Sequence, residues 1–301
     1  MPRFSSNQRG MVAIVFAMAC FVGNDTAMKL ASSALPLSEA IFLRGLFASF
    51  FCLVVILARG QIATLRHVGQ KLVLARACTE IIGTFTFLAA LRLMPISDVT
   101  AIEQIVPLLL TGYAALVLRE TVAPARLLAI AIGFAGALMI AAPSGQISVG
   151  AWLAFGTALA VTARDLLGRR MHNSVSPLAV TLAGMIIVGT AAFAVSWVPG
   201  LEPPWIIPSP AIFGLLLASS ILLSTAYVAM IMALRLGQVQ ALAPFYYSQT
   251  LFALLAGLFI FGDHLSAQAL LGTALVVAAG LFVIAPLRGR ASCAAAVVPH
   301  E

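Results

Sequence analysis

Charged side chains are scarce in this chain, since Asp, Glu, Lys and Arg make up only 9% of its 301 residues. A soluble domain carries about 25%. Hydrophobic residues reach 62%, and the mean hydropathy is +1.07. This leaves too little polar surface to cover a soluble globule, and the composition is too apolar for a disordered chain. We therefore expect an all-α membrane protein.

Sequence signatures of enzymes and metal sites are also missing. The chain has no GKS/T phosphate loop, no HExxH and no GxSxG, and no carboxylate cluster suited to a divalent metal. Its four cysteines form no CxxC pair. We expect no cofactor, no metal site and no enzyme activity. A membrane-embedded enzyme, such as a lipid-modifying transferase, is the less favoured alternative, because it needs a catalytic cluster.

Long apolar runs, separated by charges and by Pro or Gly breaks, are the main feature that is present. About 20 apolar residues cross about 30 Å of hydrocarbon, so these runs predict ten spans. We expect the spans over residues 11–31, 38–58, 71–91, 97–118, 124–142, 149–168, 177–197, 210–233, 239–261 and 266–286.

Basic residues are distributed unevenly between the ends of these spans. The net charge of +7 does not indicate nucleic-acid binding, because the arginines sit mostly where apolar runs end. With the N-terminus inside, only Lys29 and Arg92 fall on the outer side. The positive-inside rule therefore predicts that both termini are cytoplasmic. The inner side holds 12 basic residues: Arg3, Arg9, Arg59, Arg66, Lys71, Arg119, Arg126, Arg169, Arg170, Arg235, Arg288 and Arg290.

The chain also contains an internal repeat with a spacing of 143 residues. Leu91-Arg92-Leu93 recurs as Leu234-Arg235-Leu236, Glu120 recurs as Asp263, and Ala142-Pro143 recurs as Ala285-Pro286. These matches predict five-helix repeats over 11–143 and 149–286, followed by a short cytoplasmic tail, 287–301. Five is an odd number, so the second repeat should have inverted topology, with a central cavity between the halves. This architecture does not require an oligomer.

Several residues in this arrangement resemble the drug/metabolite transporter superfamily and its EamA-repeat family. They are Gly23-Asn24, Lys29, Arg44, Pro107 and the turn pairs Arg119-Glu120 and Gly262-Asp263. Within the superfamily the chain resembles bacterial aromatic amino-acid and metabolite exporters. The resemblance implies a ten-helix basket in the bacterial inner membrane, and it makes Arg44 a scaffold feature. One departure is that Leu182 and Ala183 stand in the second half near the place of Arg44.

Glu80 is the most informative ionisable residue within a span, because a charge at membrane depth costs about 2.5–3.5 kcal/mol. Thr84 and Phe87 follow it at i+4 and i+7, so one helix face presents a carboxylate, a hydroxyl and a ring. Glu80 is a candidate to meet a substrate ammonium or a proton. Alternatively it pairs with Arg76 at i−4, and both roles can hold together.

Polar residues in the first two spans have both structural and functional interpretations. Asn24 either forms an interhelical hydrogen bond or lines the cavity. Asp25 is spaced i, i+4 from Lys29, which also fits an exposed pair near the outer surface. Arg44 needs a carboxylate or carbonyl partner, with Glu39 and Asp25 the candidates by depth. We assign Asp25, Arg44 and Arg76 structural or gating roles.

Two spans carry a proline beside polar residues, which predicts bent helices next to a cavity. Gln104 precedes Pro107 in the fourth span. In the ninth, Pro244 is followed by Phe245, Tyr246, Tyr247, Ser248 and Gln249. Tyr227 in the eighth span is a similar candidate. We expect the two prolines to act in structure or gating, and Gln104, Tyr227, Phe245, Tyr246 and Gln249 to contact substrate.

These features predict a secondary transporter of small zwitterionic metabolites, most favourably aromatic and other neutral amino acids, that works by alternating access. Its partners are a small-molecule substrate and the bilayer, not nucleic acid. Lipophilic cations are the main rival substrates, because a carboxylate among aromatic rings also suits them. A scaffold without transport activity is a weaker interpretation, since it would not explain Glu80 or the Tyr246-Tyr247 run.

Overall fold

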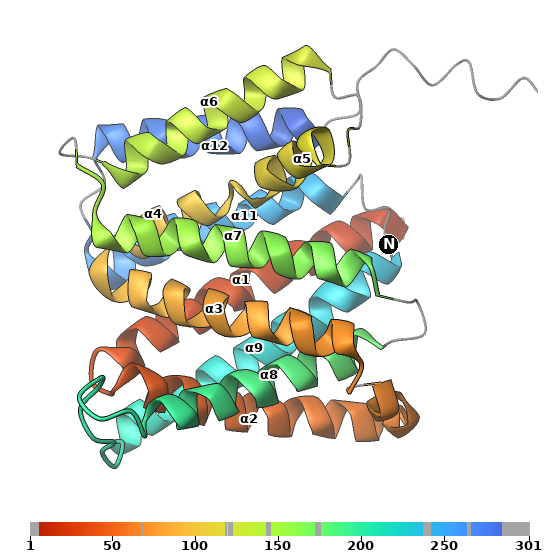
Figure 1. Cartoon of the computed structure of the whole chain (residues 1–301), viewed down its shortest axis with the longest axis vertical. Helices are drawn as coiled ribbons and strands as arrows, with labels where there is room; N and C mark the ends of the chain where they lie inside the picture. The colour runs from red at the N-terminus through yellow and green to blue at the C-terminus, as the bar shows by residue number, and fades with distance from the viewer. Residues whose placement is uncertain are drawn as a thin grey trace, which may run out of the picture.

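The computed structural model describes residues 6–67, 69–117, 119, 123–142, 146–171, 176–236, 242–263 and 266–284, and all regular structure in these ranges is helical. The elements run side by side in one bundle (Figure 1). In chain order they are α1 (Ser6–Ser32), α2 (Leu37–Ala58), η1 (Ile62–His67), α3 (Lys71–Leu93), α4 (Ile96–Glu103), α5 (Val106–Leu116), α6 (Pro124–Ala141), α7 (Val149–Arg169), α8 (Pro177–Val195), α9 (Pro210–Leu236), η2 (Ala243–Tyr247), α11 (Ser248–Ala256), η3 (Gly257–Phe261) and α12 (Ala267–Ile284).

The expected all-helical membrane fold is confirmed at this level. Within the described ranges, nine helical segments are long and apolar enough to cross a membrane. Helix α7 coincides with the expected sixth span but is not one of the nine. It carries Arg164 and Asp165 in its second half, and such charges lower the hydropathy of any window that includes them.

The two spans in which a proline lies beside polar residues are interrupted, as the sequence predicts. The fourth span is divided into α4 and α5 by a turn at Gln104 and Ile105, and Pro107 lies in the first turn of α5. In the ninth span, Pro244 lies in the 3₁₀ turn η2, ahead of α11. Proline has no N–H to give to the preceding turn, so each interruption follows from local chemistry. Residues 239–241 of the expected ninth span lie outside the described ranges.

Helices of the first half pack mainly against helices of the second half. The most extensive contacts pair α1 with α9, α3 with α7, α6 with α12 and α2 with α8, and Figure 1 shows α6 beside α12 at one end of the bundle. The first helix of each half also contacts the end of the third helix of the other half. Ser6, at the start of α1, donates a hydrogen bond to the Leu236 carbonyl at the end of α9. Gly150, at the start of α7, packs on Leu93 and Met94 at the end of α3.

Two glycines bring α6 and α12 into close backbone contact. A Cβ atom on Gly136 would lie 2.7 Å from the Gly272 carbonyl oxygen, and one on Gly272 would lie 2.6 Å from the Gly136 carbonyl oxygen. Any side chain at either position would therefore collide with the facing backbone. Small residues that let backbones approach are typical of helix pairs in membranes, and this pair forms part of the scaffold.

The turns that follow the fourth and ninth spans share an unusual backbone conformation. Arg119 has φ +54° and Gly262 has φ +63°, and the two positions are 143 residues apart, the spacing of the sequence repeat. Glycine adopts this left-handed conformation freely, whereas arginine is strained in it. The neighbouring repeat residues Glu120 and Pro143, and the expected tail 287–301, lie outside the described ranges.

The loop before α9 covers the first turn of α2. The Ser38 amide donates to Glu202 Oε2 at 3.0 Å and the Ser38 hydroxyl donates to the same oxygen at 2.6 Å. The Trp205 indole in turn donates to Ser38 Oγ at 3.0 Å. The Ile206 amide donates to Glu39 Oε2 at 3.1 Å. Glu39 is thus hydrogen-bonded to this loop, and among the described residues it forms no ion pair with Arg44.

Candidate functional site

Glu80 on α3 lies where three helices meet. Its Oε2 atom accepts a hydrogen bond from Arg76 Nη1 at 2.9 Å, and both side chains remain 15% exposed. Its Oε1 atom is 3.5 Å from the hydroxyl of Tyr227 on α9. On the third side, a Cβ atom on Gly184 of α8 would lie 2.6 Å from Oε2. The expected pairing with Arg76 is confirmed, and Tyr227 is near the same carboxylate.

Further ionisable groups interact with this pair or with one another, and together they form what we call the ionic cluster. Arg164 on α7 pairs with Asp165 at 3.1 Å and interacts electrostatically with Glu80. Glu103, at the end of α4, interacts with both Arg164 and Asp165. Asp25 on α1 interacts with Glu103 and with Arg44 on α2. The members are Asp25, Arg44, Arg76, Glu80, Glu103, Arg164 and Asp165.

The ionic cluster is almost balanced in charge. Among the described residues it contains four carboxylates and three guanidinium groups, so its net charge is minus one when every group is ionised. In a low-dielectric region such an imbalance is costly unless a proton or a bound cation offsets it. A proton on one of the four carboxylates, or a bound cation, would offset the charge of minus one.

Arg44 has an incompletely satisfied guanidinium group. It interacts electrostatically with Asp25 and Glu80, but its Nε atom is buried and has no hydrogen-bond acceptor in the described part of the chain. Buried donors are normally paired. The structure therefore places Arg44, which the sequence assigned to the scaffold, in the ionic cluster with a donor still available.

Asn24 has the structural role that was one of its two predicted alternatives. Its amide donates to Asp25 Oδ1 at 2.8 Å, and its carbonyl oxygen accepts from Ser219 of α9 at 2.7 Å. The side chain is only 2% exposed. Asn24 thus joins α1 to α9 and holds the Asp25 carboxylate beside it.

The remaining predicted contact residues separate into two groups. Thr84 and Phe87 are half-buried on α3 beyond Glu80, and Gln104 is half-buried at the break between α4 and α5. In the ninth span, Tyr246 interacts electrostatically with Asp165 of the ionic cluster. The Tyr246 hydroxyl donates to Met230 Sδ at 3.1 Å, Phe245 lines an outward apolar groove with Met11, and Gln249 is half-buried at the start of α11.

Comparisons with known proteins agree with this architecture. The sequence model of the EamA-like transporter family matches residues 8–142 and, a second time, residues 148–285. The chain belongs to the EamA-like transporter family. This family lies in the drug/metabolite transporter superfamily, so the resemblance seen in the sequence is confirmed. The EamA-like protein is thus a multi-pass membrane protein of a transporter family.

Two individual proteins are similar to this EamA-like transporter. A riboflavin transporter from Rhizobium johnstonii is 27% identical over 275 residues, covering 91% of this chain and 88% of the relative. A solved crystal structure with 18% sequence identity has a TM-score of 0.64 and covers 90% of this chain and 94% of the other. The second similarity shows the fold alone.

The structure adds residues that sequence reasoning had not assigned to the site of this EamA-like transporter. Arg164 is one of them, because it interacts with Glu80 and Glu103. Ser219 and Gly184 gave no sequence signal, because their roles depend on which helices pack together. Among the described residues, no three His, Cys, Asp or Glu side chains are grouped to hold a metal ion.

Proposed function

We propose that this EamA-like transporter is a secondary transporter of small zwitterionic metabolites with an apolar side chain, aromatic and other neutral amino acids first among them. The ionic cluster is the observation that carries this proposal. It combines one carboxylate in excess with one guanidinium nitrogen that lacks an acceptor, and a zwitterion supplies the opposite charge to each.

The ammonium and carboxylate groups of an amino acid match the excess carboxylate and the Arg44 nitrogen that lacks an acceptor. Its ammonium group would sit beside Glu80 and offset the excess negative charge, while its carboxylate would accept from Arg44. Hydrogen bonds to charged groups contribute about 1.5–3 kcal/mol each. The 15% exposure of Arg76 and Glu80 supports an open space beside them. An anionic substrate would instead add to an existing negative excess.

Aromatic side chains on α3 and α9 support an apolar, ring-bearing substrate. Tyr227 packs edge-to-face on Phe21 with the ring centroids 5.3 Å apart, which holds its ring in place. Phe87 is half-buried on α3. Offset or edge-to-face ring pairs contribute about 0.5–1.5 kcal/mol beyond area burial. Thr84, Gln104 and Gln249 are candidates to bind the polar end of the substrate.

Riboflavin is a second candidate substrate, because the curated relative with 27% identity is a riboflavin transporter. A flavin has a wide ring and many hydrogen-bonding groups but no net charge. It would use Tyr227 and Phe87 as ring partners and would leave the excess carboxylate of the ionic cluster without a cation. The geometry thus favours the zwitterion, and the relative favours the flavin.

We further propose ten spans, arranged as inverted five-helix repeats over residues 11–143 and 149–286, that alternate access to the site. The reciprocal end contacts support inversion. The start of α1 meets the end of α9, and the start of α7 meets the end of α3. Because α3 ends on the side of the bundle opposite to the start of α1, the two repeats begin on opposite sides. The basic-residue distribution supports cytoplasmic termini in a bacterial inner membrane.

Counterflow into proteoliposomes tests the substrate. Vesicles preloaded with unlabelled phenylalanine should take up labelled phenylalanine and threonine, and excess methyl viologen should barely compete. Uptake of riboflavin without amino acids would replace the first candidate with the second. Uptake of methyl viologen without amino acids would favour drug efflux, and no uptake of any of them would contradict the proposal.

A further inference from the structure

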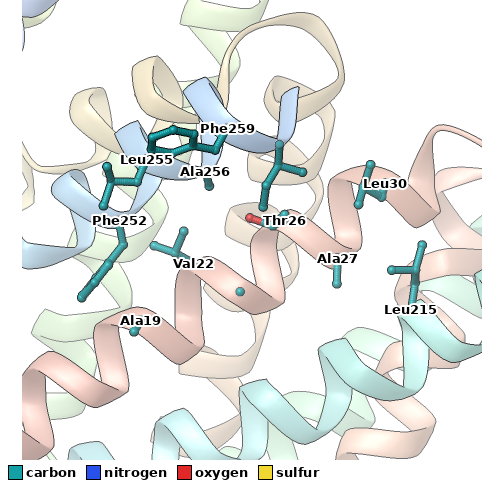
Figure 2. Close-up of a pocket in the computed structure, with 12 residues that line it drawn as sticks. Ala19, Val22, Thr26, Ala27, Leu30, Leu215, Phe252, Leu255, Ala256 and Phe259 are labelled. Atoms are coloured by element: carbon teal, nitrogen blue, oxygen red, sulfur yellow. The ribbon is translucent and has the colours of Figure 1, made fainter. Parts of the chain in front are cut away.

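An apolar groove runs along the outward face of α1. One part, of about 460 Å³, is bounded by α1, α11, η3 and Leu215 of α9. Figure 2 shows Val22, Thr26 and Leu30 of α1 facing Phe252, Leu255 and Phe259 across it. A second part, of about 440 Å³, continues toward the start of α1 and shares Ala19 and Phe252 with the first.

The length of the second part along α1 is close to the hydrocarbon thickness of one bilayer leaflet. Its α1 residues run from Met11 to Ala19, a rise of about 12 Å at 1.5 Å per residue. Half of the hydrocarbon core is about 15 Å thick. Its other wall is formed by Phe245 and Phe252. A single acyl chain of a lipid in the leaflet nearest the N-terminus would therefore fill this part along its length.

The two ends of the groove differ in charge. Arg9 is exposed at the N-terminal end and precedes Val12 and Phe16 by three and seven residues, so it shares their helix face. At the other end, the Lys29 ammonium donates to the Met94 carbonyl at 3.0 Å and lies 4.7 Å from the Phe261 ring. Asp98 and Asp263 also interact with Lys29, so that end carries more negative than positive charge.

We propose that this groove is a binding site for an anionic phospholipid, with the headgroup phosphate at Arg9 and one acyl chain along Met11 to Ala19. The start of α1 adds the partial positive charge of a helix N-terminus. The groove lining is apolar apart from Thr26, so it excludes the charged headgroup and admits the chain. The proposal does not depend on which substrate is transported.

Selective quenching of a tryptophan in the groove tests this site. The three native tryptophans, Trp152, Trp197 and Trp205, are first replaced with Phe, and Phe16→Trp then places a probe in the groove. Phe50→Trp is the matched control, because Phe50 on α2 is 61% exposed and does not line the groove. It lies eight residues before the end of α2, and α2 ends on the same side of the bundle as the start of α1.

The measurement compares brominated phosphatidylglycerol with brominated phosphatidylcholine in proteoliposomes. The anionic lipid should quench the Phe16→Trp probe with about fivefold greater affinity, since one Arg near the membrane surface contributes about 1 kcal/mol. Arg9→Gln should reduce this ratio to about one, and the Phe50→Trp probe should show a ratio near one throughout. Equal quenching by the two lipids at Phe16→Trp, an unchanged ratio in Arg9→Gln, or the same preference at Phe50→Trp would each overturn the proposal.

A second readout covers the case in which the tryptophan-free background does not fold. Native mass spectrometry of delipidated wild-type protein should show retention of phosphatidylglycerol over phosphatidylcholine, and Arg9→Gln alone should remove the preference. Equal retention of the two lipids by the wild-type protein would refute the site.

Discussion

The carboxylate of Glu80 lies directly against the backbone of Gly184. A Cβ atom at position 184 would be 2.6 Å from Glu80 Oε2, the same oxygen that accepts from Arg76 at 2.9 Å. Helix α8 thus contributes no functional group to the ionic cluster, yet its missing side chain decides where the carboxylate of α3 can lie. The position of Glu80 therefore depends on packing between the two halves of the chain.

Gly184→Ala should reduce transport about tenfold with little loss of stability. The added methyl group meets the end of a flexible side chain, so Glu80 moves and the backbone does not need to. A tenfold effect corresponds to about 1.4 kcal/mol of lost binding. Gly189→Ala on the same helix is the control, because a Cβ atom there would meet its neighbours at about 4.0 Å. Equal transport rates for the two variants would contradict this role of Gly184.

The contact between α6 and α12 makes a separate prediction about stability. Gly136→Ala and Gly272→Ala should each destabilise the fold by about 1–3 kcal/mol, the usual cost of overpacking, because each methyl group would meet a carbonyl oxygen of the facing helix. Thermal unfolding in detergent measures the effect. Gly112→Ala on α5 is the control, since nothing lies within 4 Å of its would-be Cβ atom. If both variants keep the wild-type melting temperature, the backbones of α6 and α12 are not in close contact at these glycines.

Arg119→Gly should stabilise the protein, by up to about 1 kcal/mol. Arg119 adopts φ +54°, a conformation that costs a non-glycine residue roughly 1–2 kcal/mol, and part of the gain is offset by the larger backbone entropy of glycine. Arg119→Ala is the control, because it removes the same charge and keeps the strain. If the alanine and glycine variants melt at the same temperature, strain at this turn is not the cause.

The orientation in the membrane can be tested independently of transport. A green fluorescent protein fused to the C-terminus should fluoresce, and an alkaline phosphatase fused after Pro286 should stay inactive, because both would remain in the cytoplasm. Active phosphatase at this position would mean that the C-terminus is periplasmic, and it would rule out ten spans with both termini in the cytoplasm.

Features encoded by local spacing were predictable from the sequence. The apolar runs correspond to the observed helices, Pro107 and Pro244 interrupt their spans, and the i, i+4 spacing of Arg76 and Glu80 gave their ion pair. In each case the relevant partner lies within one or two helical turns. Backbone geometry alone then determines which groups meet, and no knowledge of tertiary packing is required.

Features that depend on helix packing were not predictable in the same way. Arg164 on α7 interacts with Glu80 on α3 because these two helices pack together, and no spacing within either helix indicates this. Phe245 and Tyr246 were grouped as neighbours, but consecutive residues face different directions. One lines the outward groove and the other contacts Met230. A single sequence does not reveal which helix covers a given face.

The most direct test of the account asks whether Glu80 binds substrate or only neutralises Arg76. Glu80→Gln should reduce phenylalanine counterflow by about 100-fold, equivalent to roughly 3 kcal/mol for a lost charged hydrogen bond, while the protein still inserts and folds. The deciding measurement is counterflow by the Arg76→Met, Glu80→Gln double variant, which removes both charges of the pair. We predict that it remains inactive, because the ammonium site is still missing; recovery of transport would show that Glu80 serves only to neutralise Arg76.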